Sequence, residues 1–221
     1  MRIRGTTVSL VAGVALTCGA GSGFGWASAT GCSTPAAPFV TVWLANSQVA
    51  KSSADSTLAV AYAQRLASEI FAGVGVKLEW REGVPGDKAV CADTLTMKID
   101  PSAPSSAGPL AMAYATVGRK QEVAIHLLYD RIKATRSPAL QRKLLAHVMV
   151  HEITHVLEGI ARHSSEGIMK AQWDDSDYMI MAKHPLPFAE EDIRLVHAHF
   201  SAGATSQSVP GAICSASPWN R

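Results

Sequence analysis

Charge and cysteine are both scarce in this sequence. Charged residues make up 17% of the 221 residues, and no run of like charge exceeds three residues. Lysine and arginine number 20 against 18 acidic residues, and a formal net charge of +2 excludes a strongly basic nucleic-acid-binding protein. The four cysteines lack the short spacings of a cysteine-ligated metal site. Hydrophobic residues, at 48%, suffice for a globular core, and the length fits one ordinary domain or two small ones.

We predict that residues 1–29 form a secretory signal peptide. Two arginines precede an apolar stretch over residues 8–18, which is too short to span a membrane, and Ala27 and Ala29 provide an A-x-A cleavage site. Cleavage after Ala29 would leave equal numbers of basic and acidic residues. The product would be exported to the periplasm or the extracellular space, without stable membrane insertion. The alternatives are a lipoprotein acylated at Cys18 and an uncleaved membrane anchor.

Export would place the remaining cysteines in an oxidising compartment. Cys32, Cys91 and Cys214 would stay in the mature chain, where three cysteines allow one disulfide with a spare thiol, or none. Pairing Cys91 with either of the others would tie one chain end to the body of the protein. The sequence does not choose between these pairings, and it does not indicate an oligomeric state.

The first half of the remaining chain alternates between strand and helix patterns, after a proline-bearing linker over residues 30–38. Residues 39–44 alternate and are rich in β-branched types, which predicts a strand, whereas Leu58, Tyr62 and Leu66 recur at helical spacing. We expect a helix over 53–71 and strands over 39–44, 76–80, 94–99, 111–117 and 123–128.

The second half centres on one long helix and closes with a shorter one. Pro138 marks the start of the long helix and Gly159 its end. Residues 164–187 have an irregular pattern, and acidic residues favour a closing helix over 187–200. We therefore expect an α+β fold. Its parts would be one domain over residues 39–200 and a loose C-terminal tail over residues 201–221.

The long helix carries two histidines and a glutamate in a metal-binding pattern. His151 and His155 are four residues apart, so on a helix they are rotated by only ~40° and separated by ~6 Å. Both imidazoles can therefore reach one ion, and neutral imidazole suits Zn²⁺. Glu152 can take a proton from a zinc-bound water that attacks a carbonyl carbon, and then pass it to the leaving amine. A surface or buried structural histidine pair is the alternative.

His163 is the leading candidate for a third ligand, since a catalytic zinc site usually has three protein ligands and one open position. On a straight helix it would lie ~12 Å along the axis from His155, so the chain has to turn between them. Gly159 sits where a helix stop would make this turn. A surface loop histidine is one alternative for His163. Rival carboxylate ligands are Glu158, Glu166, Asp174, Asp175 and Asp177.

The stretch His151-Glu152-x-x-His155-x-x-x-Gly159-x-x-x-His163-Ser164, followed by Gly167-Ile168-Met169, resembles the metzincin zinc metallopeptidases. It looks most similar to a set of exported bacterial metzincin-like proteins, and the resemblance extends over residues 39–200. In the usual metzincin spacing the glycine comes one residue earlier and the third histidine two residues earlier. The resemblance implies a zincin fold, in which a small mixed β-sheet packs on a long active-site helix beside a short irregular and helical C-terminal subdomain. It also implies one catalytic Zn²⁺, held by the three histidines, and a peptide or protein substrate.

The same resemblance assigns supporting roles to residues outside the histidine motif. Met169 would be the Met-turn residue, forming a hydrophobic floor under the imidazoles, and Tyr178 would polarise the substrate carbonyl. Residues 111–117 would be the edge strand that pairs with an extended peptide, a mode that reads backbone rather than sequence. An ordinary core role for Met169 and a packing or surface role for Tyr178 are the alternatives.

We do not expect the other five histidines to bind the metal. His147 shares a helical face with His151, and we expect it to fill the helix core rather than support a metal site. The remaining four are His126, His184, His197 and His199.

Together these patterns predict an exported zinc-dependent metalloendopeptidase. One alternative is a zinc-binding protein of the same fold that is catalytically weak or inactive and serves in binding or structure. Another is a zinc hydrolase that acts on a non-peptide amide or ester.

Overall fold

The structure of the chain is a computed structural model that describes residues 37–45, 53–85, 93–100, 111–115, 123–135 and 137–206. All of these residues belong to one unit, Ala36–Arg221. The predicted signal peptide and all four cysteines lie outside the described residues.

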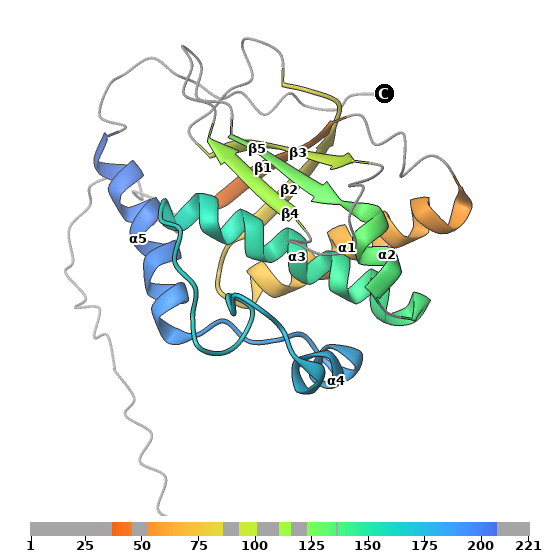
Figure 1. Cartoon of the computed structure of the whole chain (residues 1–221). Helices are drawn as coiled ribbons and strands as arrows, with labels where there is room; N and C mark the ends of the chain where they lie inside the picture. The colour runs from red at the N-terminus through yellow and green to blue at the C-terminus, as the bar shows by residue number, and fades with distance from the viewer. Residues whose placement is uncertain are drawn as a thin grey trace, which may run out of the picture. The chain divides into compact units, whose positions relative to one another are not determined.

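Five strands form one mixed sheet (Figure 1). They are β1 (Phe39–Ala45), β2 (Lys77–Glu82), β3 (Thr94–Asp100), β4 (Ala111–Ala115) and β5 (Val123–Leu128). Their order is β2-β1-β3-β5-β4, with parallel pairing throughout except for the antiparallel edge strand β4. Parallel neighbours need a crossover connection, which a helix provides between β1 and β2. The small mixed sheet predicted from the sequence is confirmed.

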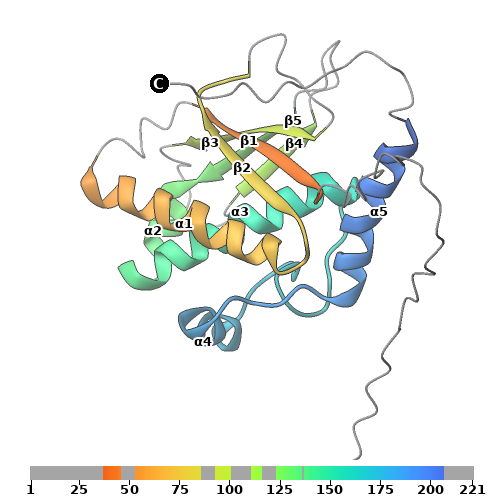
Figure 2. The ribbon, with the colours of Figure 1, turned by 180° about the vertical axis from the view of Figure 1, so that it is seen from behind.

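Five helices complete the described part of the chain. They are α1 (Ala54–Ala72), α2 (Tyr129–Thr135), α3 (Pro138–Glu158), α4 (Asp175–Lys183) and α5 (Glu190–Ser206). The long helix α3 is central, because it contacts the other four helices as well as β4 and β5. Figures 1 and 2 show α1 and α3 on the same side of the sheet. Residues 144–154 of α3 are buried without interruption, as expected for a helix covered on all sides. The predicted packing of the sheet on one long helix is confirmed.

Two helices are not predicted by the sequence. Helix α2 starts at the residue after β5 ends, with no glycine or proline between them. Helix α4 lies within residues 164–187, for which an irregular structure was expected. Its start is fixed by a capping box in which Asp174 and Asp177 each bind the other's backbone N–H. Helix α5 also runs beyond residue 200, into the predicted tail.

Not all of the large apolar side chains of α1 face the core. Leu58, which shares its helical spacing with Tyr62 and Leu66, is 62% exposed. Ala63 and Ala67 are buried beside Leu66 and Ile70, and their small side chains allow α1 to lie close against α3. None of the described helices is both long and apolar enough to cross a membrane.

Candidate metal centre

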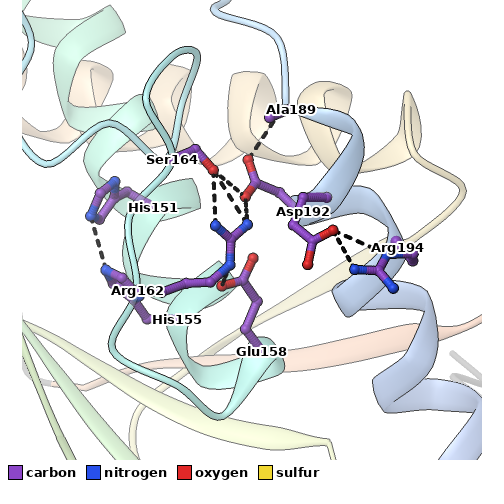
Figure 3. Close-up of polar contacts among 9 residues, drawn as sticks. His151, His155, Glu158, Arg162, Ser164, Ala189, Asp192 and Arg194 are labelled. Atoms are coloured by element: carbon purple, nitrogen blue, oxygen red, sulfur yellow. Dashed lines mark hydrogen bonds and ion pairs between the residues drawn. The ribbon is translucent and has the colours of Figure 1, made fainter.

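The last turns of α3 bring two imidazoles together. His151 is buried and His155 half-buried, and their Nε2 atoms are 3.1 Å apart (Figure 3). The rings meet edge to face, with centroids 4.7 Å apart and planes at 84°. The helical spacing of four residues therefore places both imidazoles at one point, as predicted.

A left-handed turn then ends the helix and returns the chain toward these rings. Gly159 has φ 67°, and its N–H donates to the carbonyl of His155 at 3.0 Å. This confirms the predicted helix stop. After it, the His163 ring centroid lies 5.3 Å from that of His151 and 4.9 Å from that of His155. One nitrogen from each of the three rings lies within 4.8 Å of the others.

The donor set fits a zinc ion. Two nitrogens that bind one tetrahedral Zn²⁺ at ~2.0–2.1 Å are about 3.3–3.4 Å apart, close to the separation of the His151 and His155 Nε2 atoms. Within the part of the chain that the structure describes, these three histidines are the one group of three or more His, Cys, Asp or Glu residues spaced to share an ion. None of the rival carboxylates joins that group.

Burial keeps the helical imidazoles neutral, which is the form that binds metal. It lowers the pKa of His151 to about 4, an effect to which the two neighbouring imidazoles add. Burial also lowers the pKa of His155, followed in importance by the charge of His163. Nδ1 of His151 lies 2.9 Å from the carbonyl oxygen of Ile168 and donates to it, which leaves the Nε2 lone pair facing the other rings.

Glu152 lies on α3 beside the first histidine and is 9% exposed. Burial raises the pKa of its carboxyl group to about 7. A carboxyl with a pKa near neutrality takes up and releases a proton at neutral pH with little driving force lost, as a general base requires.

The loop after His163 carries the Ile168 carbonyl that contacts His151, and backbone contacts fix this loop in place. The Ser164 N–H donates to the Met169 carbonyl at 2.9 Å, and the Ile168 N–H donates to the Pro187 carbonyl at 2.9 Å. Gly167, with φ 72°, approaches the same carbonyl so closely that a Cβ there would lie 2.3 Å from its oxygen. Met169 is fully buried in the hydrophobic core, and its role as a floor beneath the imidazoles stays a prediction.

Sequence reasoning missed Trp173, which stands edge to face against two histidines. Its ring centroid lies 5.7 Å from that of His151 and 6.2 Å from that of His147. His147 is fully buried, donates from Nδ1 to the Lys143 carbonyl at 2.7 Å and accepts the Leu186 N–H at 3.0 Å. His147 therefore fills the helix core, as predicted. No spacing marks Trp173 in the sequence, and Ile168 acts through its backbone, which no residue type signals.

The other candidate residues lie in separate interactions. Tyr178 is half-buried in α4 and packs against the hydrophobic core, as its packing alternative expects. Asp174 and Asp177 bind Lys170, and Glu166 is exposed. The Glu158 side chain has no exposed surface and faces Nε of Arg162 at 3.6 Å.

The four remaining histidines lie outside the group of three. His126 pairs with Asp100 at 2.6 Å, whereas Nε2 of His197 donates to the Val74 carbonyl at 2.7 Å. His199 pairs with Asp93 at 2.8 Å, and the exposed His184 lies next to the Pro185 carbonyl.

Comparison with known proteins yields matches among solved structures only. No family model matches the chain, and no curated protein matches it. Among solved structures, the chain is similar to the crystal structure of archaemetzincin from Methanopyrus kandleri, with a TM-score of 0.43 and 13% sequence identity. The match covers 75% of this chain and 96% of that chain.

Proposed function

We propose that this chain is a zinc-dependent metallopeptidase with Glu152 as its general base. The observation that carries the proposal is the convergence of His151, His155 and His163 beside a buried carboxyl group. Three imidazole ligands would leave a fourth tetrahedral position open, which is the arrangement of a catalytic rather than a structural zinc site.

The chain's own residues would divide the chemistry between them. A bound zinc ion supplies Lewis acidity, which acidifies water and polarises a carbonyl group. The three histidines would hold the ion. Glu152 takes the proton of the attacking water and returns it to the amine that leaves when the peptide C–N bond breaks. The positive charge of the ion favours the carboxylate form of Glu152 and so offsets the effect of burial on its pKa.

An extended peptide is the substrate that suits the sheet. Strand β4 is an edge strand, paired on one side with β5, and α3 contacts it. A peptide added along the outer side of β4 would form main-chain hydrogen bonds and lie next to the active-site helix. We propose this edge as the substrate-binding strand.

We also propose that the protein is exported, with cleavage after Ala29. The support is the arginine-bearing start, the apolar residues 8–18 and the A-x-A site. Mass spectrometry of the protein recovered from its native host tests this, because a mature N-terminus at Thr30 is expected. An intact N-terminus on the folded protein would contradict it.

The function is tested on Glu152→Gln, with the wild type and Glu166→Gln as controls. We expect about one zinc per chain in all three proteins. Hydrolysis of an unfolded, fluorescently labelled protein should fall by ~10²–10⁴-fold in Glu152→Gln only, because its amide cannot accept the proton. Zinc bound with no cleavage by the wild type would favour the inactive zinc-binding protein. Equal cleavage by the wild type and Glu152→Gln would contradict the proposed mechanism.

A further inference from the structure

His163 is held differently from the other two histidines. His151 and His155 are fixed by α3, whereas His163 is exposed and lies after the helix end, where residues 161–163 have no regular structure. Ordering an exposed loop and its side chain costs conformational entropy, which would weaken metal binding. Some other contact has to fix this segment if its imidazole is to bind tightly.

The two neighbours of His163 in sequence bind one and the same carboxylate (Figure 3). Nη2 of Arg162 donates to Oδ1 of Asp192, and the Ser164 hydroxyl donates to that oxygen at 2.6 Å. The arginine also reaches the Ser164 hydroxyl from Nη1 at 3.2 Å and from Nη2 at 3.3 Å. The residues immediately before and after His163 in sequence therefore both bind Asp192.

Asp192 is a firm anchor. It is fully buried in the first turn of α5, and its second oxygen accepts the Ala189 N–H at 3.0 Å. A buried carboxylate persists as a charge only when such partners compensate its lost hydration. Helix α5 itself packs on α3 and is tied to the rest of the unit through His197 and His199.

Arg162 also binds the helix that carries the first two histidines. Its Nε faces Glu158 at 3.6 Å, and that carboxyl group lies in the last turn of α3. One guanidinium thus connects the end of α3 with the start of α5, across the segment that holds His163. Arginine suits this position because its planar fork offers several donors in fixed directions.

We propose that Arg162, Ser164 and Asp192 are positioning residues for His163, and that their contacts hold its imidazole toward His151 and His155. The inference rests on the metal centre proposed above. None of the three residues would touch the ion or the substrate. They would act by removing the freedom of the loop before the metal binds.

The test compares Arg162→Met with Arg194→Met in the full chain. Arg194 is a matched control, because it binds Glu191 on α5 near Asp192 but is exposed (Figure 3). Zinc affinity is measured by competition with a chromophoric chelator, and Co²⁺ loading reports the ligand set through its visible absorption. In Arg162→Met we expect about 10–100-fold weaker zinc binding and the cobalt spectrum of His163→Ala. Arg194→Met should keep both properties of the wild type, and Arg162→Lys should recover part of the affinity.

A double-mutant cycle separates positioning from a general loss of stability. If Arg162 acts through His163, adding His163→Ala to Arg162→Met costs little further affinity, whereas additive losses would overturn the proposal. Unchanged zinc affinity in a folded Arg162→Met would also overturn it. If that variant does not fold, Ser164→Ala, which removes a single hydroxyl, is judged by the same affinity and spectrum.

The outcomes also distinguish this proposal from the proposed function. If the wild type binds zinc but cleaves nothing, and zinc affinity is lower in Arg162→Met, the peptidase proposal is overturned and the positioning role is supported. If the wild type cleaves the substrate and Arg162→Met binds zinc as tightly as the wild type, the peptidase is supported and the positioning role is overturned. A wild type that takes up neither zinc nor cobalt overturns both.

Discussion

Replacing Gly167 with alanine should damage both stability and metal binding, whereas the same change at Gly159 should be mild. Both glycines have positive φ, 72° and 67°, so an alanine at either position costs ~1–2 kcal/mol of backbone strain. They differ in their surroundings. A Cβ at Gly159 meets nothing within 4 Å, but one at Gly167 would lie 2.3 Å from the Pro187 oxygen. The pair therefore separates backbone strain from close approach.

The additional loss of stability at Gly167 arises because the loop has to move away from Pro187. The loop must shift by about 1 Å to reach an ordinary contact, which lengthens the hydrogen bond from the Ile168 N–H to Pro187. An unsatisfied buried donor costs roughly 1–3 kcal/mol, so together with the backbone strain we expect a total of roughly 2–5 kcal/mol for Gly167→Ala. The same shift moves the Ile168 carbonyl away from His151, which should weaken zinc binding by about 10-fold or more.

Urea unfolding of the metal-free proteins measures the first effect, and chelator competition measures the second. Gly167→Ala should be less stable than Gly159→Ala by roughly 1–3 kcal/mol. Equal destabilisation of the two variants, or wild-type zinc affinity in Gly167→Ala, would refute the claim that this close approach holds the loop against the metal centre.

Three further predictions concern the same region. Burial lowers the pKa of His147 to about 4 in the folded chain against 6.5 when unfolded, so the unfolded state binds the extra proton first. The free energy of unfolding of the wild type should therefore exceed that of His147→Gln by its full amount above pH 6.5, and this difference should shrink by up to roughly 3 kcal/mol as the pH falls to about 4. Urea titrations across this pH range measure the difference, and a constant difference would contradict the prediction. Removing the metal with a chelator should abolish cleavage while the far-ultraviolet circular dichroism stays unchanged, because α3 is held by its burial on all sides; unfolding on metal removal would contradict this. Zinc should change the fluorescence of the wild type but much less that of Trp173→Phe, because Trp173 lies against His151; an equal change in both would show that other tryptophans report the binding.

The parts of the fold that the sequence predicts are those with strong local signals. Helix α3 has an apolar run, a proline at its start and a glycine that takes the left-handed conformation at its end. Helix α4 was missed because its large apolar residues, Tyr178 to Met181, are consecutive in sequence and so do not show a helical period. Its signal is a capping box, which lies in a polar stretch that reads equally well as a loop.

In the candidate site, too, residues close in sequence could be predicted and residues distant in sequence could not. The spacing of His151, Glu152 and His155 is a property of one helix, so the sequence is enough to bring them together. Asp192 lies 30 positions from Arg162 and 28 from Ser164, and no local pattern connects residues at that distance. The two helical histidines were thus predictable, whereas the contacts that we infer to hold His163 were not.

The anchoring of α5 bears on the order in which the proposed metal centre is assembled as the chain folds. His197 and His199 join α5 to partners 123 and 106 positions earlier in the chain, and such distant contacts are slow to form because loop closure opposes them. If α5 positions His163 as we propose, the zinc site gains its third ligand only once these contacts are made. Unfolded segments are the natural substrates of a peptidase, and a newly made chain is itself full of them. A site completed only by contacts this far apart in sequence would therefore stay inactive until most of the chain is folded, so that newly made molecules would not cut one another.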